Sequence, residues 1–172
     1  MWNTLSRMLK TGLLTEPRPA PDQTAPTLET LGKELLEILG RALCIRHVDA
    51  GSCNGCELEI QALNNPYYNL EGAGVQFVAS PRHADLLLVT GPVSVNMEEA
   101  LRRTYDAMPA PKLVIAIGDC GACGGILGAS YASRGSVANI LPVNTTVTDC
   151  PPTPTAILRG ILETVRPVLK KA

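Results

Sequence analysis

Six cysteines are the residues of this sequence whose type and spacing point most directly to chemistry. Cys53 and Cys56 are separated by two residues, a gap that lets both thiolates reach one metal centre, and Cys120 and Cys123 repeat it. Cys120 and Cys150 would join Cys53 and Cys56 to complete a set of four. Glycines flank these cysteines, so tight turns can leave backbone N–H groups free to point at sulfur. The pattern suits an anionic iron-sulfur cluster.

Two C-x-x-C pairs are also typical of a structural zinc site, and a single pair of a redox dithiol. Zinc ribbons usually separate their pairs by about 15 to 20 residues. Cys56 and Cys120 are instead separated by a long segment with its own predicted strands and helix. The spacing by itself leaves a cluster, zinc and buried unliganded thiols as alternatives.

Acidic residues stand close to these cysteines, and each has two interpretations. Glu57 and Glu59 can relay protons or tune a potential, or they can favour the dipole of a helix in whose first turn they lie. Asp49, Asp119 and Asp149 each lie within four residues of a candidate ligand. Their carboxylates are expected to accept hydrogen bonds from loop N–H groups.

The composition excludes several classes of protein. The chain has 172 residues, 45% of them hydrophobic and 18% charged, which predicts one folded domain with a buried core. A formal net charge of -1 supplies no basic field for nucleic acid, which is therefore not an expected partner. No apolar run approaches the roughly 18 residues of a membrane span, so we expect the chain to stay in the cytoplasm.

Short apolar runs alternate with helical patterns, which is typical of an α/β fold with a mostly parallel sheet. Each cysteine group lies just past the carboxyl end of a predicted strand, and in an open α/β sheet these ends share one edge. Asn96 and Thr153 are the expected N-caps of two of the helices. Strands are predicted at 44–49, 75–79, 85–90, 112–118 and 144–149, and helices at 56–63, 97–108 and 154–169.

The first 26 residues are expected to form a unit separate from the α/β domain at 27–172. Residues 1–14 have the spacing of a short amphipathic helix, and the prolines between Pro17 and Pro26 predict an extended tether. We expect this helix to dock on membrane subunits or at the lipid interface; a mobile tail is the alternative. A leucine stripe predicts a further helix from Thr27 to about Leu43.

The segment from Leu113 to Leu158 is nearly free of charge, since its only charged residues are Asp119, Arg134 and Asp149. It is rich in Gly, Pro, Ser and Thr, so much of it is expected to be loop. Solvent-facing loops normally carry more charge. We therefore expect another protein to cover much of this surface; a neutral loop facing water is the alternative.

Four motifs, VDAGSCNGCELEI, SPRHADLLLVTGPV, IGDCGACGGI and DCPPTP, occur in this order within about residues 45–168. Together they resemble the small electron-transfer subunit of membrane-bound group 4 nickel-iron hydrogenases, including formate hydrogenlyase complexes. The same family contains the complex I 20 kDa subunit that carries the terminal cluster. Complex I chains usually have two adjacent cysteines at the first motif. The spacing of Cys53 and Cys56 therefore favours a hydrogenase over a quinone reductase.

The resemblance implies a flavodoxin-like sheet with helices on both faces and one 4Fe-4S cluster held by Cys53, Cys56, Cys120 and Cys150. It implies no catalytic residue in this chain, and Cys123 gains no ligand role from it. The implied partners are a large nickel-iron catalytic subunit, a ferredoxin-like iron-sulfur subunit and integral membrane subunits. The chain would then be a peripheral electron-transfer subunit on the cytoplasmic side of the membrane. A zinc-stabilised interaction module is the alternative from another class.

Overall fold

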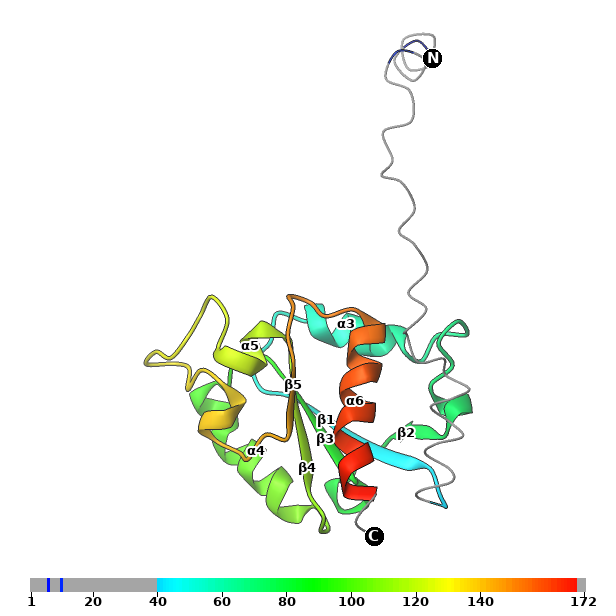
Figure 1. Cartoon of the computed structure of the whole chain (residues 1–172). Coiled ribbons are helices and arrows are strands. Elements are labelled where there is room, and N and C mark those ends of the chain that lie inside the picture. The colour runs from blue at the N-terminus through cyan, green and yellow to red at the C-terminus, as the bar shows by residue number, and fades with distance from the viewer. Residues whose placement is uncertain (1–5, 7–9, 11–39, 170–172) are drawn as a thin grey trace.

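The computed structural model describes residues 6, 10 and 40–169 of the chain. A central sheet is surrounded by helices, with the last helix lying along it (Figure 1). Its strands are β1 (Leu43–Asp49), β2 (Val75–Phe77), β3 (Leu86–Thr90), β4 (Leu113–Ile117) and β5 (Thr145–Val147). The α-helices are α3 (Gly55–Ala62), α4 (Val95–Ala107), α5 (Gly118–Cys123) and α6 (Pro154–Leu169), and short 3-10 helices are η1 (Glu71–Ala73), η2 (Pro81–His83) and η3 (Val137–Asn139).

The sheet is parallel throughout, in the order β2-β1-β3-β4-β5. This is the flavodoxin-like order, so the predicted fold class is confirmed. Every residue of β3 and β4 is buried, as expected for central strands covered on both faces. The chain crosses from one side of β1 to the other between β2 and β3. Ligands of open α/β sheets bind beyond the strand ends at such a switch point.

Helices cover both faces of the sheet. On one face Ile45 and Ile115 pack with Ile60 of α3 and Ile161 of α6. On the other face the buried side chains of β3 and β4 pack with Leu101 of α4 and with residues of η3. Apolar surface from alternate strand positions is thus removed from water on both sides, which is the main stabilising contribution to such a sheet.

The helix starts only partly follow the predictions. Thr153 caps α6 as expected, since its Oγ1 accepts the backbone N–H of Ala156 at 3.3 Å. Asn96 is not the cap of α4: the helix begins earlier, and the carbonyl oxygen of Ser94 accepts N–H groups of Met97 and Glu98. Leu43, expected at the end of a helix, is the first residue of β1.

Helix α5 was not predicted. Its sequence, GDCGAC, contains two glycines, which disfavour a helix in isolation, so this stretch was expected to be a loop. The helix packs on β3, β4 and β5, and this tertiary contact overrides the local preference. Of the predicted N-terminal amphipathic helix the structure describes only Ser6 and Lys10, both helical, and the proline tether and the helix from Thr27 lie outside the described residues. Among the residues described, no helix is long and apolar enough to cross a membrane.

Candidate metal centre

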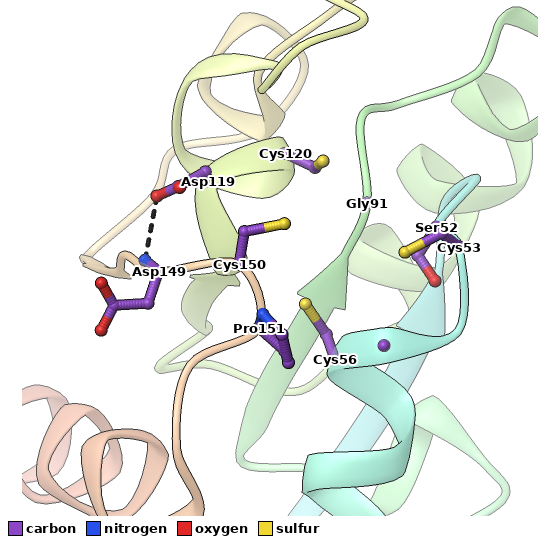
Figure 2. Close-up of a pocket in the computed structure, with 10 residues that line it drawn as sticks. Ser52, Cys53, Cys56, Gly91, Asp119, Cys120, Asp149, Cys150 and Pro151 are labelled. Carbon is purple, nitrogen blue, oxygen red and sulfur yellow. Dashed lines mark hydrogen bonds between the residues drawn. The ribbon is translucent and has the colours of Figure 1, made fainter. Parts of the chain in front are cut away.

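Four segments meet beyond the carboxyl ends of the strands and enclose one small cavity (Figure 2). They are the loop between β1 and α3, Gly91 after β3, the start of α5 after β4, and the turn between β5 and α6. The cavity has a volume of about 40 Å³. It is lined by Ser52, Cys53, Gly55, Cys56, Gly91, Asp119, Cys120, Asp149, Cys150 and Pro151.

All four cysteines of the expected ligand set line this cavity, and Figure 2 shows their sulfur atoms directed toward the same space. Cys56 is buried, Cys120 is half-buried, and Cys53 and Cys150 are exposed at the rim. They come from three separate segments, including the first turns of α3 and α5, that parallel strands bring to one edge. The expectation that the cysteine groups converge is thus confirmed, whereas their role as ligands is not tested by this geometry.

Two glycines leave room for the thiols. A Cβ on Gly118 would lie 2.7 Å from Sγ of Cys56, and a Cβ on Gly125 would lie 2.7 Å from Sγ of Cys120. Real Cβ atoms essentially never approach other atoms so closely, so any other residue would displace the sulfur or the backbone. These positions are therefore part of the cradle in which the thiols lie.

Cys123, the second cysteine of its C-x-x-C pair, does not line the cavity. It is exposed, and its Sγ donates a hydrogen bond to the carbonyl oxygen of Asp119 at 3.2 Å. Cys44 lies near the start of β1, at the end of the sheet opposite the cavity. The structure therefore separates both cysteines from the four that converge.

Of the three aspartates expected to bind loop N–H groups, Asp49 and Asp119 do so. Oδ1 of Asp49 accepts backbone N–H groups of Gly51 and Ser52 at 2.8 and 2.7 Å, which fixes the turn before Cys53. Oδ1 of Asp119 accepts the backbone N–H of Asp149 at 2.9 Å. The second contact joins two segments that are distant in sequence.

The surroundings of Cys56 and Cys120 favour the protonated thiol when no metal is bound. Burial raises the pKa of Cys56 to about 12, and the charges of Glu57 and of the other cavity cysteines add to the shift. Burial also raises the pKa of Cys120, and the charges of Cys150 and Cys53 raise it further. Because metals bind thiolates, assembly of a metal centre here must release protons.

Glu57 lies in the first turn of α3 but does not face solvent. It is buried, and among the described residues neither carboxylate oxygen has a hydrogen-bond partner. Nε2 of His47 lies 3.8 Å from its Oε1 and is hydrogen-bonded to Oγ1 of Thr90 at 3.0 Å. Burial lowers the pKa of His47, against the opposing effect of Glu57. The Glu57 carboxylate is therefore buried beside His47 and is not a solvent-exposed group at the start of the helix.

The residues present fit a cluster better than a single metal ion. Four soft thiol donors surround a cavity, and thiolates are the ligands of iron-sulfur clusters. Within residues 40–169 no three His, Cys, Asp or Glu side chains lie close enough together to hold a single ion.

Gly91 and Ser52 line the cavity but had no assigned role in the sequence. Gly91 has φ +77°, and a Cβ there would lie 2.4 Å from the backbone nitrogen of Ser52. Glycine at this position thus permits the loop after β3 to pass directly against the loop after β1. In the sequence, Gly91 could have been identified as a site residue because it directly follows a buried strand, at the edge where the other cavity residues lie.

The family comparison agrees with this geometry. Residues 53–164 match the family described as NADH ubiquinone oxidoreductase, 20 Kd subunit. This match covers more than half of the chain and includes all the cysteines of the cavity. The chain belongs to this family of oxidoreductase subunits.

Its relatives include subunits of hydrogenase complexes. The chain is 44% identical over 135 residues to the probable membrane-bound hydrogenase subunit mbhJ of Pyrococcus furiosus, with 78% of this chain and 81% of the relative covered. It is 39% identical over 142 residues to formate hydrogenlyase subunit 7 of Escherichia coli, covering 83% of this chain. The match spans 56% of that second protein's length.

A solved structure gives a similar result. A chain of the membrane-bound sulfane sulfur reductase, an archaeal respiratory membrane complex, aligns with a TM-score of 0.67 and 31% identity. The alignment covers 80% of this chain and 77% of the other. The relatives thus belong to more than one kind of membrane complex.

Proposed function

We propose that this chain is the electron-transfer subunit of a membrane-bound, energy-converting hydrogenase and holds one 4Fe-4S cluster. Its partners would be a ferredoxin-like iron-sulfur subunit, a large nickel-iron catalytic subunit and integral membrane subunits. It would lie on the cytoplasmic side of the membrane as a peripheral subunit. The convergence of Cys53, Cys56, Cys120 and Cys150 on one cavity supports this proposal most directly.

A bound 4Fe-4S cluster exchanges single electrons without making or breaking substrate bonds. The residues of this chain then determine how it is held. Thiolates from three segments would supply the ligands, glycines allow close approach, and burial of Cys56 limits its contact with water. Such surroundings set the potential of a cluster within a range of about -700 to +450 mV.

The surface beside Cys120 supports docking of a partner near the cavity. Ile126, Leu127 and Tyr131 are exposed, and the loop that carries them begins directly after α5. Exposed apolar side chains in a segment nearly without charge are typical of a protein interface. A partner bound there would bring its own redox centre close to the cavity.

A complex I type quinone oxidoreductase is the principal alternative, because the family contains such subunits. The two-residue gap between Cys53 and Cys56 and the identity to hydrogenase relatives favour the hydrogenase. Hydrogen-evolution assays and nickel analysis of the intact complex discriminate, since the alternative predicts neither activity nor nickel.

Metal analysis of the purified full chain tests the cluster itself. About four iron atoms per chain with acid-labile sulfide are expected, whereas about one zinc without sulfide would establish the zinc-stabilised module instead. Cys123→Ala should keep the iron and the paramagnetic signal of the cluster. Cys150→Ala should lose the cluster or leave a three-iron form. The reverse result for these two matched variants would refute the ligand set.

A further inference from the structure

Asp119 and Asp149 make reciprocal hydrogen bonds across the cavity edge. The backbone N–H of Asp119 donates to the carbonyl oxygen of Asp149 at 3.1 Å. In the other direction, the backbone N–H of Asp149 donates to Oδ1 of Asp119 at 2.9 Å (Figure 2). Each aspartate directly precedes a cavity cysteine, so the pair joins the segment of Cys120 to the segment of Cys150.

The Asp149 backbone needs such support. It has φ +98°, in the left-handed half of conformational space that a residue with a Cβ rarely adopts. Such conformations are unfavourable for a residue with a Cβ and persist only where surrounding contacts fix them. Asp149 is itself exposed, so its side chain does not anchor the turn by burial.

The carbonyl oxygen of Asp119 is held in turn by the last residue of α5 and by the segment after that helix. It accepts the backbone N–H of Gly125 at 3.1 Å and the thiol of Cys123 at 3.2 Å. The residue is therefore fixed from both sides, and its carboxylate has a defined direction toward the Asp149 peptide. A charged acceptor also makes a stronger hydrogen bond than a neutral one.

We propose that Asp119 is a positioning residue for the Cys150 ligand. Its carboxylate holds the strained Asp149 peptide, and this fixes the turn so that the Cys150 thiolate stays on the cluster. This inference rests on the proposed function, because it assigns a role toward the same metal centre. Without the carboxylate the turn relaxes, and Cys150 becomes the first ligand to be lost.

The test compares Asp119→Ala with Asp119→Asn in the purified, iron-loaded full chain. Alanine removes the acceptor, whereas asparagine loses the charge but keeps an oxygen that can accept the Asp149 N–H. Asp119→Asn therefore also serves as the control for charge, because it removes the negative charge of residue 119 and leaves an acceptor in place. The readouts are hydrogen exchange at the Asp149 amide and the paramagnetic signal after mild oxidation.

Asp119→Ala should speed exchange at Asp149 by about tenfold, which corresponds to the loss of one hydrogen bond, and should give a three-iron signal. Asp119→Asn should restore slow exchange and the four-iron form. Unchanged exchange in Asp119→Ala overturns the hydrogen bond on which the proposal depends. Faster exchange with an intact four-iron signal overturns the link to Cys150. A parent chain that binds no iron refutes the proposed function, and the exchange measurement still tests the hydrogen bond separately.

Discussion

The Cys120 thiol fits at the cavity because residue 125 is glycine. Gly125 has φ +55°, and a Cβ there would meet Sγ of Cys120 at 2.7 Å and its Cα at 3.2 Å. Gly125→Ala should therefore push Cys120 from its place and reduce the iron bound per chain by half or more. Iron and acid-labile sulfide, measured per chain after anaerobic purification, check this expectation.

Gly128 offers a matched control. Its φ of +54° is nearly identical to that of Gly125, but a Cβ there would meet nothing within 4 Å. Both alanine variants carry the same backbone penalty of about 1 to 2 kcal/mol, so both should unfold at lower denaturant concentration. Only Gly125→Ala should lose iron. Equal iron in the two variants would show that this close approach does not matter for the cluster.

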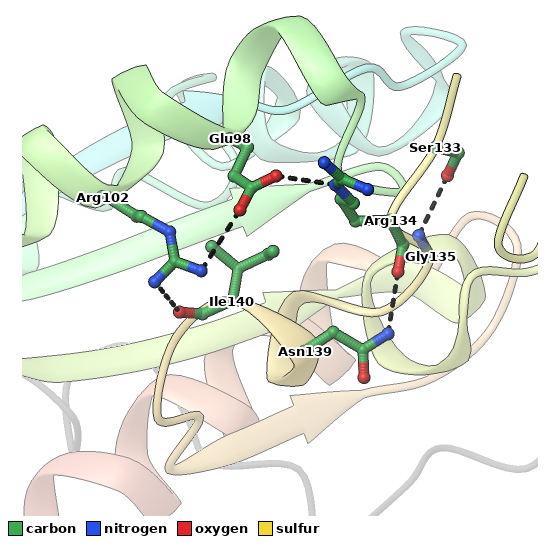
Figure 3. Close-up of polar contacts among 7 residues, drawn as sticks. All are labelled: Glu98, Arg102, Ser133, Arg134, Gly135, Asn139 and Ile140. Carbon is green, nitrogen blue, oxygen red and sulfur yellow. Dashed lines mark hydrogen bonds and ion pairs between the residues drawn. The ribbon is translucent and has the colours of Figure 1, made fainter. Parts of the chain in front are cut away.

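Glu98 joins helix α4 to the loop that follows α5 (Figure 3). Its Oε2 accepts Nε–H of Arg134 at 2.7 Å, and its Oε1 accepts a guanidinium N–H of Arg102 at 3.2 Å. Arg102 also donates to the carbonyl oxygen of Ile140, and Asn139 donates to that of Arg134. The loop that presents Tyr131 is thus held against α4 by a network rather than by one contact.

These contacts predict a pH-dependent contribution to stability. Hydrogen bonds from Arg134 and Arg102 lower the pKa of Glu98 below its ordinary value of 4.5. A depressed folded-state pKa gives stability that is present above pH 4.5 and is lost as the pH falls through the folded value. Glu98→Gln should therefore lower the Tm at pH 7, and its Tm should approach that of the parent under acid conditions.

Glu99→Gln is the control for this helix, since it breaks one ion pair with Arg103 on the exposed surface. Exposed pairs contribute little, so its Tm at pH 7 should stay close to that of the parent. The Tm of the parent, Glu98→Gln and Glu99→Gln is compared by thermal unfolding at several pH values. A Glu98→Gln difference that is equal at pH 7 and at low pH would contradict the role given to the charge.

The whole chain has one edge suited to a redox partner. The cavity lies at the carboxyl ends of the strands, and the loop with the exposed Ile126 and Tyr131, part of the low-charge segment 113–158, begins there after α5. Amides of this segment should exchange more slowly once the large catalytic subunit is bound. Residues 106–112, which precede β4 at the other end of the sheet, should exchange equally in both states. Equal exchange of the low-charge segment, free and assembled, would refute this interface.

Local sequence was sufficient for most of the fold. Apolar runs separated by helical patterns predicted all five strands and the helices α3, α4 and α6, though not α5, because buried parallel strands and amphipathic helices leave distinct periodicities. The N-cap of α6 was also local, since Thr153 lies directly before Pro154 at the first helical position. Docking of the N-terminal segment stays a prediction, because those residues lie outside the described part of the chain.

The sequence by itself determined that the cysteine groups lie at one edge of the sheet, because each follows a parallel strand. The structure decided which cysteines meet there. Cys53–Cys56 and Cys120–Cys123 have the same spacing, yet Cys123 turns away to bond the carbonyl oxygen of Asp119. Its direction depends on how α5 packs against β3, β4 and β5, a set of long-range contacts that a two-residue gap does not contain.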